Sequence, residues 1–123
     1  MKFNPNIVRD ILENHFSDEV DDYVIGDLQN FDTEEIEIEF ELEATTIELD
    51  AVVYIDVQDD IETETTADNT TLVSGTAVLD VEVDGFDEER INCGTTTVSM
   101  VYSYSFEVDE EGKFTNLYME WVD

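Results

Sequence analysis

The sequence predicts an α+β fold in which one N-terminal amphipathic helix packs on one face of an antiparallel sheet of about five strands, with an acidic opposite face. Two observations lead to this expectation. Apolar residues recur with helical spacing near the N-terminus, and from residue 34 onward they alternate with polar residues in several segments. The length of 123 residues fits a single domain over residues 1–123, because no Pro-rich linker or internal repeat divides it.

The predicted helix covers residues 5–16. Asn4 and Pro5 suit the N-cap and the first helical position. The face that would pack on the sheet recurs at i, i+4 spacing and consists of Ile7, Val8, Ile11, Leu12, His15 and Phe16. The following segment, residues 18–24, is compatible with either a second short helix or an irregular connection.

Two strands are expected in and after EEIEIEFELEATTIELD, residues 34–50. Apolar residues occupy the even positions up to Ala44 and the odd positions from Ile47 to residue 57. A two-residue hairpin at Thr45-Thr46 explains this change of parity, because it would place Ala44 opposite Ile47 and align the two apolar faces. Thr-Thr is unfavourable in the primed turns of hairpins, so a bulge in one long bent strand is the alternative.

Three further strands are expected in residues 77–84, 96–108 and 114–122, where apolar residues again alternate. The acidic segment 58–71 fits a long loop or the exposed tip of a hairpin, because Ala67-Asp68-Asn69 is a turn signal.

The net charge is the most unusual property of the sequence. There are 34 acidic and 4 basic side chains, which gives −30 at pH 7. Binding to nucleic acids or to anionic membranes is disfavoured, because both depend on Lys and Arg. The natural complement is a basic protein partner, or cations from solution.

The sequence offers little for catalysis or for cofactor binding. His15 and Cys93 are the only residues of their types, so neither a His-based nucleophile system nor a zinc site is expected. We assign no catalytic residue, cofactor or metal ligand, and we expect neither enzymatic activity nor a small-molecule ligand. The N-terminal residues lack the apolar core of a signal peptide, which favours a cytoplasmic location.

The candidate partner-binding residues are carboxylates at the outward positions of the predicted strands. They are Glu35, Glu37, Glu39, Glu41, Glu43, Glu48, Asp50, Asp56, Asp80, Glu82 and Asp84. The expected hairpin would oppose Glu43 with Glu48, Glu41 with Asp50, and Glu35 with Asp56, although opposed like charges destabilise a sheet. Two such strands would present about one charge per 3.4 Å, roughly half the linear charge density of B-DNA.

In size, net charge and the ordered carboxylates of EEIEIEFELE and DVEVD, the chain resembles the small acidic DNA-mimic inhibitors of phages and mobile elements. This class includes anti-CRISPR and anti-restriction proteins. Its members share no single fold, so the resemblance assigns no role to an individual residue. It implies a stoichiometric inhibitor that occupies the DNA-binding groove of a CRISPR effector or restriction nuclease in a bacterial cytoplasm.

Two alternatives use the same composition. One is a salt-adapted small domain, since halophilic proteins are also acidic and poor in Lys. The other is an immunity or chaperone-like protein that binds a basic toxin or a histone-like partner.

Overall fold

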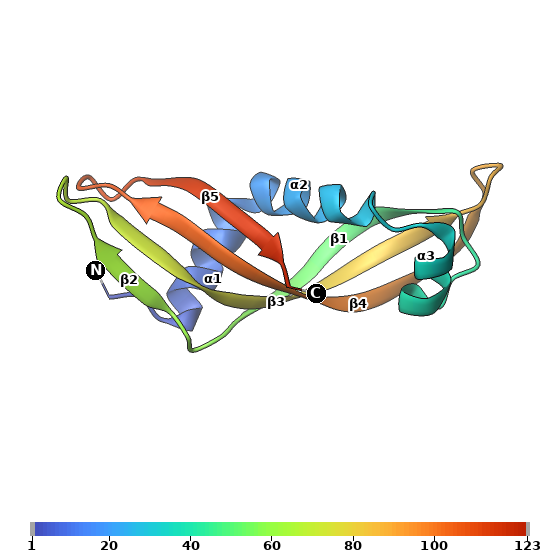
Figure 1. Ribbon diagram of the computed structural model, residues 1–123, viewed down its shortest axis with the longest axis horizontal. Coiled ribbons are helices and arrows are strands. Elements are labelled where there is room, and N and C mark those ends of the chain that lie inside the picture. Colours follow the sequence, from blue (N-terminus) through green and yellow to red (C-terminus); the bar gives the residue numbers. More distant parts are fainter. Residues whose placement is uncertain (1, 123) are drawn as a thin grey trace.

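The computed structural model describes residues 2–122 and contains three helices and a five-stranded antiparallel sheet (Figure 1). The helices are α1 (Pro5–Asn14), α2 (Ser17–Leu28) and α3 (Thr33–Phe40). The strands are β1 (Thr46–Val57), β2 (Glu62–Thr65), β3 (Thr71–Phe86), β4 (Asn92–Val108) and β5 (Phe114–Trp121). The order across the sheet is β1-β3-β4-β5, and β2 also pairs with β3. The predicted α+β class is therefore confirmed.

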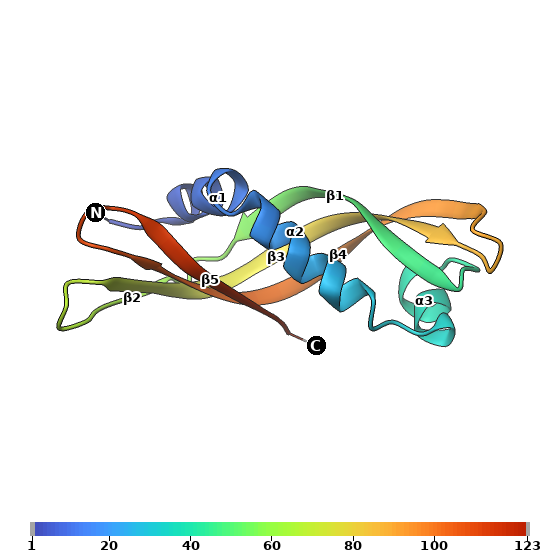
Figure 2. The same cartoon turned by 90° about the horizontal axis from the view of Figure 1, so that it is seen from above.

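The sheet twists strongly along the long axis of the molecule. At the right of Figure 1, β1 lies above β3 and β4, whereas at the left β5 and β4 lie above β3 and β2. The helices follow one face of this twisted sheet, which we call the inner face: α1 lies behind it, α2 above it and α3 in front of it (Figures 1 and 2). The outer face is the opposite one.

Alternate side chains of β3 and β4 form the core beneath the helices. The buried residues of the two strands are Val73, Ala77, Leu79, Val81, Val83, Met100, Tyr102, Tyr104, Phe106 and Val108. Cross-strand partners share a face, so that Leu79 lies opposite Met100 and Val73 opposite Phe106. Both strands are longer than their predicted segments.

The N-terminal helix is confirmed. The side chain of Asn4 accepts a hydrogen bond of 2.9 Å from the backbone N–H of Ile7, and Val8, Ile11 and Leu12 are buried. No helix in the described part of the chain is long and apolar enough to cross a membrane.

The segment after α1 forms a helix rather than an irregular connection. In α2 the buried residues Val20, Val24 and Leu28 recur every four positions, which directs one stripe toward the sheet. Two hydrogen bonds join this helix to the strands. The Tyr23 hydroxyl donates to the carbonyl of Leu117 over 2.9 Å, and the Tyr102 hydroxyl donates to the carboxylate of Asp27 over 2.7 Å.

The strand predicted for residues 34–44 is wrong, because most of this segment forms α3. Ile36 and Phe40 are buried and four residues apart, a spacing that fits a helical turn as well as the alternation of a strand. Ile38, which alternation would place beside them, is 67% exposed.

Local interactions at its N-terminus favour the helix. Asp32 caps α3 by accepting a 2.8 Å hydrogen bond from the backbone N–H of Glu35, and the Glu35 side chain accepts one from the N–H of Asp32. This capping box satisfies two backbone donors that a helix start leaves unpaired. Phe31 and Ile36 occupy the two positions of a hydrophobic staple.

Neither the hairpin at Thr45-Thr46 nor the alternative bulge at that site exists. The backbone N–H and the hydroxyl of Thr45 both donate to the carbonyl of Phe86, over 2.9 and 3.1 Å. This contact starts the pairing of β1 with β3, a strand distant in sequence. The number of strands still agrees with the prediction, because β2 replaces the rejected strand.

Of the two alternatives for the acidic segment 58–71, a long loop or the exposed tip of a hairpin, the structure contains the hairpin. The short strand β2 pairs with the start of β3, and the backbone N–H of Thr66 donates to the carbonyl of Thr70 over 2.8 Å. Asn69 has a φ of 62°, which Asn tolerates better than most residues.

The C-cap of α3 provides a test of local strain. Glu41 has a φ of 56° and a ψ of 34°, in the left-handed region where residues with a Cβ are disfavoured. We expect Glu41→Gly to raise the free energy of unfolding by roughly 0.5–1 kcal/mol in denaturant titrations. The control is Glu43→Gly, which removes the same charge where φ is not positive. Equal effects of the two variants would refute the role of strain.

The tyrosines of the core predict a loss of stability at alkaline pH. Burial, followed by the hydrogen bond to Asp27 and its charge, raises the pKa of Tyr102, and burial with the charge of Asp60 raises the pKa of Tyr104, both well above 10. In the unfolded chain these phenols ionise near pH 10, whereas in the folded chain they stay neutral. The free energy of unfolding should therefore fall as pH rises above 10.

Single Tyr→Phe variants separate the two contributions. The buried Tyr104 hydroxyl has no hydrogen-bond partner among residues 2–122 and lies across Gly75, where a Cβ would approach it to 2.6 Å. Tyr104→Phe should be at least as stable as wild type at pH 7 and lose less stability above pH 10. Tyr102→Phe should instead cost about 1 kcal/mol at pH 7, because it removes a hydrogen bond. A clear destabilisation by Tyr104→Phe at pH 7 would contradict this assignment.

Candidate partner-binding face

The outer face carries the carboxylates of β1 and β3 side by side. Along β3, the side chains of Asp80, Glu82 and Asp84 point away from the core, since Leu79, Val81 and Val83 are buried. On β1, Glu48 lies directly opposite Asp84, and Ala51 lies opposite Glu82. The register shifts between Leu49 and Ala51, so that Asp50 occupies a bulge next to Glu82.

We call Glu48, Asp50, Asp80, Glu82 and Asp84 the acidic cluster. Its central interaction joins Asp50 and Glu82. Hydrogen bonding to Asp50, followed by burial and by the charges of Asp50 and Asp84, raises the pKa of Glu82. The cluster is therefore a place where carboxylates repel one another and where one of them retains a proton to higher pH.

Hydroxyl groups of β4 partly compensate the cluster. Ser99 lies opposite Asp80 and donates a 2.9 Å hydrogen bond to its carboxylate, and Thr95 lies opposite Asp84 and donates to it in the same way. These neutral donors solvate the carboxylates without cancelling their charge, so the face remains strongly negative.

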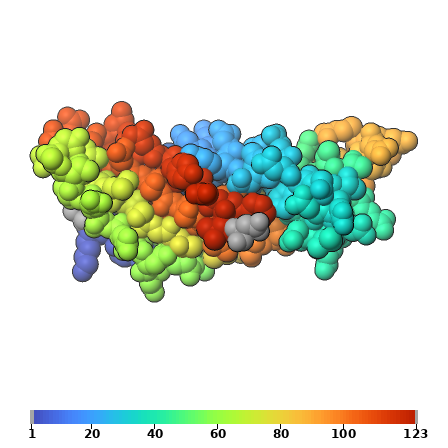
Figure 3. Space-filling view, viewed as in Figure 1, coloured from blue at the N-terminus to red at the C-terminus, as the bar shows by residue number. Residues whose placement is uncertain are grey.

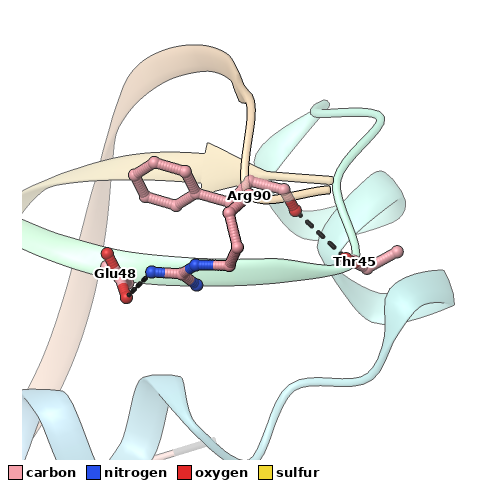
Figure 4. A network of polar contacts seen from close by, with 4 residues as sticks. Thr45, Glu48 and Arg90 are labelled. Atoms are coloured by element: carbon pink, nitrogen blue, oxygen red, sulfur yellow. Dashed lines mark hydrogen bonds and ion pairs between the residues drawn. The ribbon is translucent and has the colours of Figure 1, made fainter. Parts of the chain in front are cut away.

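Arg90 makes the one ion pair found among residues 2–122. Its guanidinium donates to the carboxylate of Glu48 over 2.8 Å and lies over the ring of Phe86, 4.9 Å from the centroid (Figure 4). The two charged side chains are 62% and 51% exposed, so the pair is screened and adds little stability. Most of the acidic cluster has no cationic partner within the described chain.

The structure divides the predicted site residues into two groups. Six lie on the two neighbouring strands β1 and β3, namely Glu48, Asp50, Asp56, Asp80, Glu82 and Asp84. The other five lie in α3 or in the connection after it, namely Glu35, Glu37, Glu39, Glu41 and Glu43. The predicted oppositions of Glu43 with Glu48, Glu41 with Asp50 and Glu35 with Asp56 are wrong, because residues 34–44 do not pair with β1.

Sequence reasoning missed Thr95, Ser99 and Arg90 as neighbours of the carboxylates. The positions of the hydroxyls could have been predicted from the sequence, because Thr95, Thr97 and Ser99 alternate with the inward residues of β4. No pattern in the sequence predicts the contact of Arg90 with Glu48, because it depends on the turn after β3.

The described residues show no metal-binding cluster. Within residues 2–122, no three or more His, Cys, Asp or Glu side chains converge as metal ligands. A cavity of about 480 Å³ lies between α2 and β1, with Leu28, Phe31, Ile47 and Leu49 in its lining and Arg90 beside them. Comparisons with protein-family models, with curated proteins and with solved structures gave no significant match.

The raised pKa of Glu82 predicts a pH-dependent stability. Unfolded Glu82 ionises near pH 4.5, and folded Glu82 at higher pH, so its contribution to stability is lost as pH rises from 4.5 through the folded pKa. Glu82→Gln should raise the melting temperature at pH 7 more than at pH 4, and less in high salt. The matched control is Glu64→Gln on β2, which is exposed and outside the acidic cluster. A gain that does not change with pH would exclude the repulsion.

Proposed function

We propose that the protein is an acidic DNA-mimic inhibitor that binds the basic groove of a bacterial defence nuclease, of the CRISPR or restriction type, and excludes DNA from it. The acidic cluster is the observation that carries this proposal. From Asp80 to Asp84 the strand spans about 14 Å, at about 3.4 Å per residue. Five carboxylates lie along this length on β1 and β3, about one per 3 Å. B-DNA presents one charge per roughly 1.7 Å.

The shape of the sheet supports the same function. β3 has 16 residues and would extend over roughly 50 Å, comparable to the length of about fifteen base pairs. The helices cover the inner face, and Figure 3 shows β2 and β5 uncovered at the left, with α2 above and α3 at the right; the acidic cluster lies in the other half of the sheet, beyond this view. A long, twisted sheet can enter a groove that accommodates a duplex, and the acidic cluster supplies negative charge along part of its outer face.

The energetics favour a basic partner. Repulsion within the acidic cluster is a cost that the free protein bears, and Lys or Arg side chains of a partner would relieve it. Association would also release the counterions held by both surfaces, which makes binding steeply salt-dependent.

The experiment compares two variants of equal charge. One combines Asp80→Asn, Glu82→Gln and Asp84→Asn on β3, and the other combines Glu37→Gln, Glu39→Gln and Glu43→Gln at the α3 end. Immobilised wild-type protein should capture nucleic-acid-binding proteins from a bacterial lysate at low salt. Added duplex DNA should compete for these proteins and elute them. The β3 variant should bind the released protein at least about tenfold more weakly, whereas the α3 variant should bind nearly as well.

Three outcomes would count against the proposal. Failure to capture any protein that duplex DNA releases would overturn it. Equal losses in both variants would show that total charge, and not the acidic cluster, governs binding. Loss of the native circular dichroism spectrum of the wild type in the low-salt buffer would favour the salt-adapted alternative.

A further inference from the structure

The second half of the sheet contains a long segment without charge. Residues 91–106 include no Asp, Glu, Lys or Arg, although the chain has 34 acidic residues among 123. Most of this segment is β4, the strand next to the carboxylates of β3.

The first half of β4 is an open edge. β5 pairs with β4 only from Tyr102 to Val108, and the backbone N–H of Val122 then donates to the carbonyl of Val101 over 2.8 Å. Within residues 2–122, no strand pairs with Asn92–Met100 on the side away from β3.

The backbone groups at this edge can be assigned by alternation. The carbonyl of Val101 points toward β5, and the N–H and C=O of every second residue in an antiparallel strand point to the same side. Thr95, Thr97 and Ser99 therefore direct their backbone donors and acceptors to the open edge. Their side chains are exposed on the outer face.

This edge lacks the devices that usually prevent strand addition. Its residues include no Lys or Pro, and the ladder between Thr95 and Met100 is regular. By contrast, the opposite edge strand β1 has two register shifts. The open half of β4 is therefore a template for one more strand.

The negative charge beside this edge favours an added strand with cationic side chains. Asp84, Glu82 and Asp80 lie one strand inward, opposite Thr95, Thr97 and Ser99. An added strand would lie about 9.6 Å from β3, a gap that extended Lys or Arg side chains can span above the short hydroxyl side chains.

A second copy of the chain fits less well. It would bring a further net charge of −30, and Val122 already lies beside Val101, where a strand added along β4 would continue. The occupant that suits this edge has an extended backbone and cationic side chains on one face.

We propose that an extended segment of the partner, with Lys or Arg at alternate positions, adds to the sheet as an antiparallel strand beside Thr95–Ser99. Its backbone pairs with the open edge while its cationic side chains reach the acidic cluster. This inference rests on the proposed function, because it presumes a basic partner. It adds that backbone pairing, and not charge alone, positions that partner.

The test uses three synthetic nonapeptides with the same charge, each alternating Lys and Val from a first to a last Lys. One is unmodified, one is N-methylated at the internal Lys residues, and one is N-methylated at the Val residues. Directly opposed residues share a face, so Lys N–H groups should pair with Thr95, Thr97 and Ser99. Fluorescence anisotropy should show similar binding of the unmodified and Val-methylated peptides, and binding at least about tenfold weaker for the Lys-methylated peptide.

Hydrogen exchange provides the second measurement. The amides of Thr95, Thr97 and Ser99 should exchange more slowly when the unmodified peptide is bound, whereas those of Thr96 and Val98 already pair with β3. Equal affinity of all three peptides would overturn the inference and leave the proposed function intact. The inference would also be overturned, with the proposed function intact, if no peptide bound while duplex DNA still released a captured protein. Protection of the edge in the protein alone, increasing with its concentration, would identify a second copy as the occupant.

Discussion

The ladder between β3 and β4 is the interaction on which the rest of the structure depends. It runs from Thr71–Val108 to Phe86–Asn92 and sets which side chains face the helices and which face solvent. β1 and β2 both pair with β3, and β5 pairs with β4, so every other strand is positioned by one of these two. The helices then cover the apolar face that the ladder creates, and the carboxylates of β3 must lie on the other.

Electrostatic repulsion sets the second constraint. With 34 acidic and 4 basic side chains, the chain cannot pair most of its charges. Two arginines contact the edge strand β1. Arg90 forms an ion pair with Glu48, and Arg9 donates a hydrogen bond to the Tyr54 hydroxyl over 2.8 Å. Neutral hydroxyls on β4 solvate carboxylates of β3. The result is a charged row on β1 and β3 beside a neutral strand whose edge is open, and on this arrangement we base the proposal of a basic and extended partner.

Alternation of apolar residues correctly predicts β3 and β4 but not the structure of residues 34–40. In β3 and β4 it persists through enough residues that only a strand buries all of the apolar positions on one face. In residues 34–40 the alternation is ambiguous, because the spacing of Ile36 and Phe40 fits both a helix and a strand. Only Ile38 distinguishes the two structures, since a strand would bury it and the helix leaves it exposed. The capping box of Asp32 and Glu35 was visible in the sequence and decides for the helix, since a local interaction needs no distant partner.

The sequence by itself determined the net charge, the N-terminal helix, the alternation of β3 and β4 and the presence of carboxylates on one face, because these depend on composition and on neighbours along the chain. Only the tertiary structure decided which carboxylates meet. Glu48 lies opposite Asp84 because Thr45 donates hydrogen bonds to the carbonyl of Phe86, and Asp50 lies next to Glu82 because β1 bulges between Leu49 and Ala51. Pairing of distant strands depends on how whole faces pack against the helices, and no local pattern of residues encodes that register.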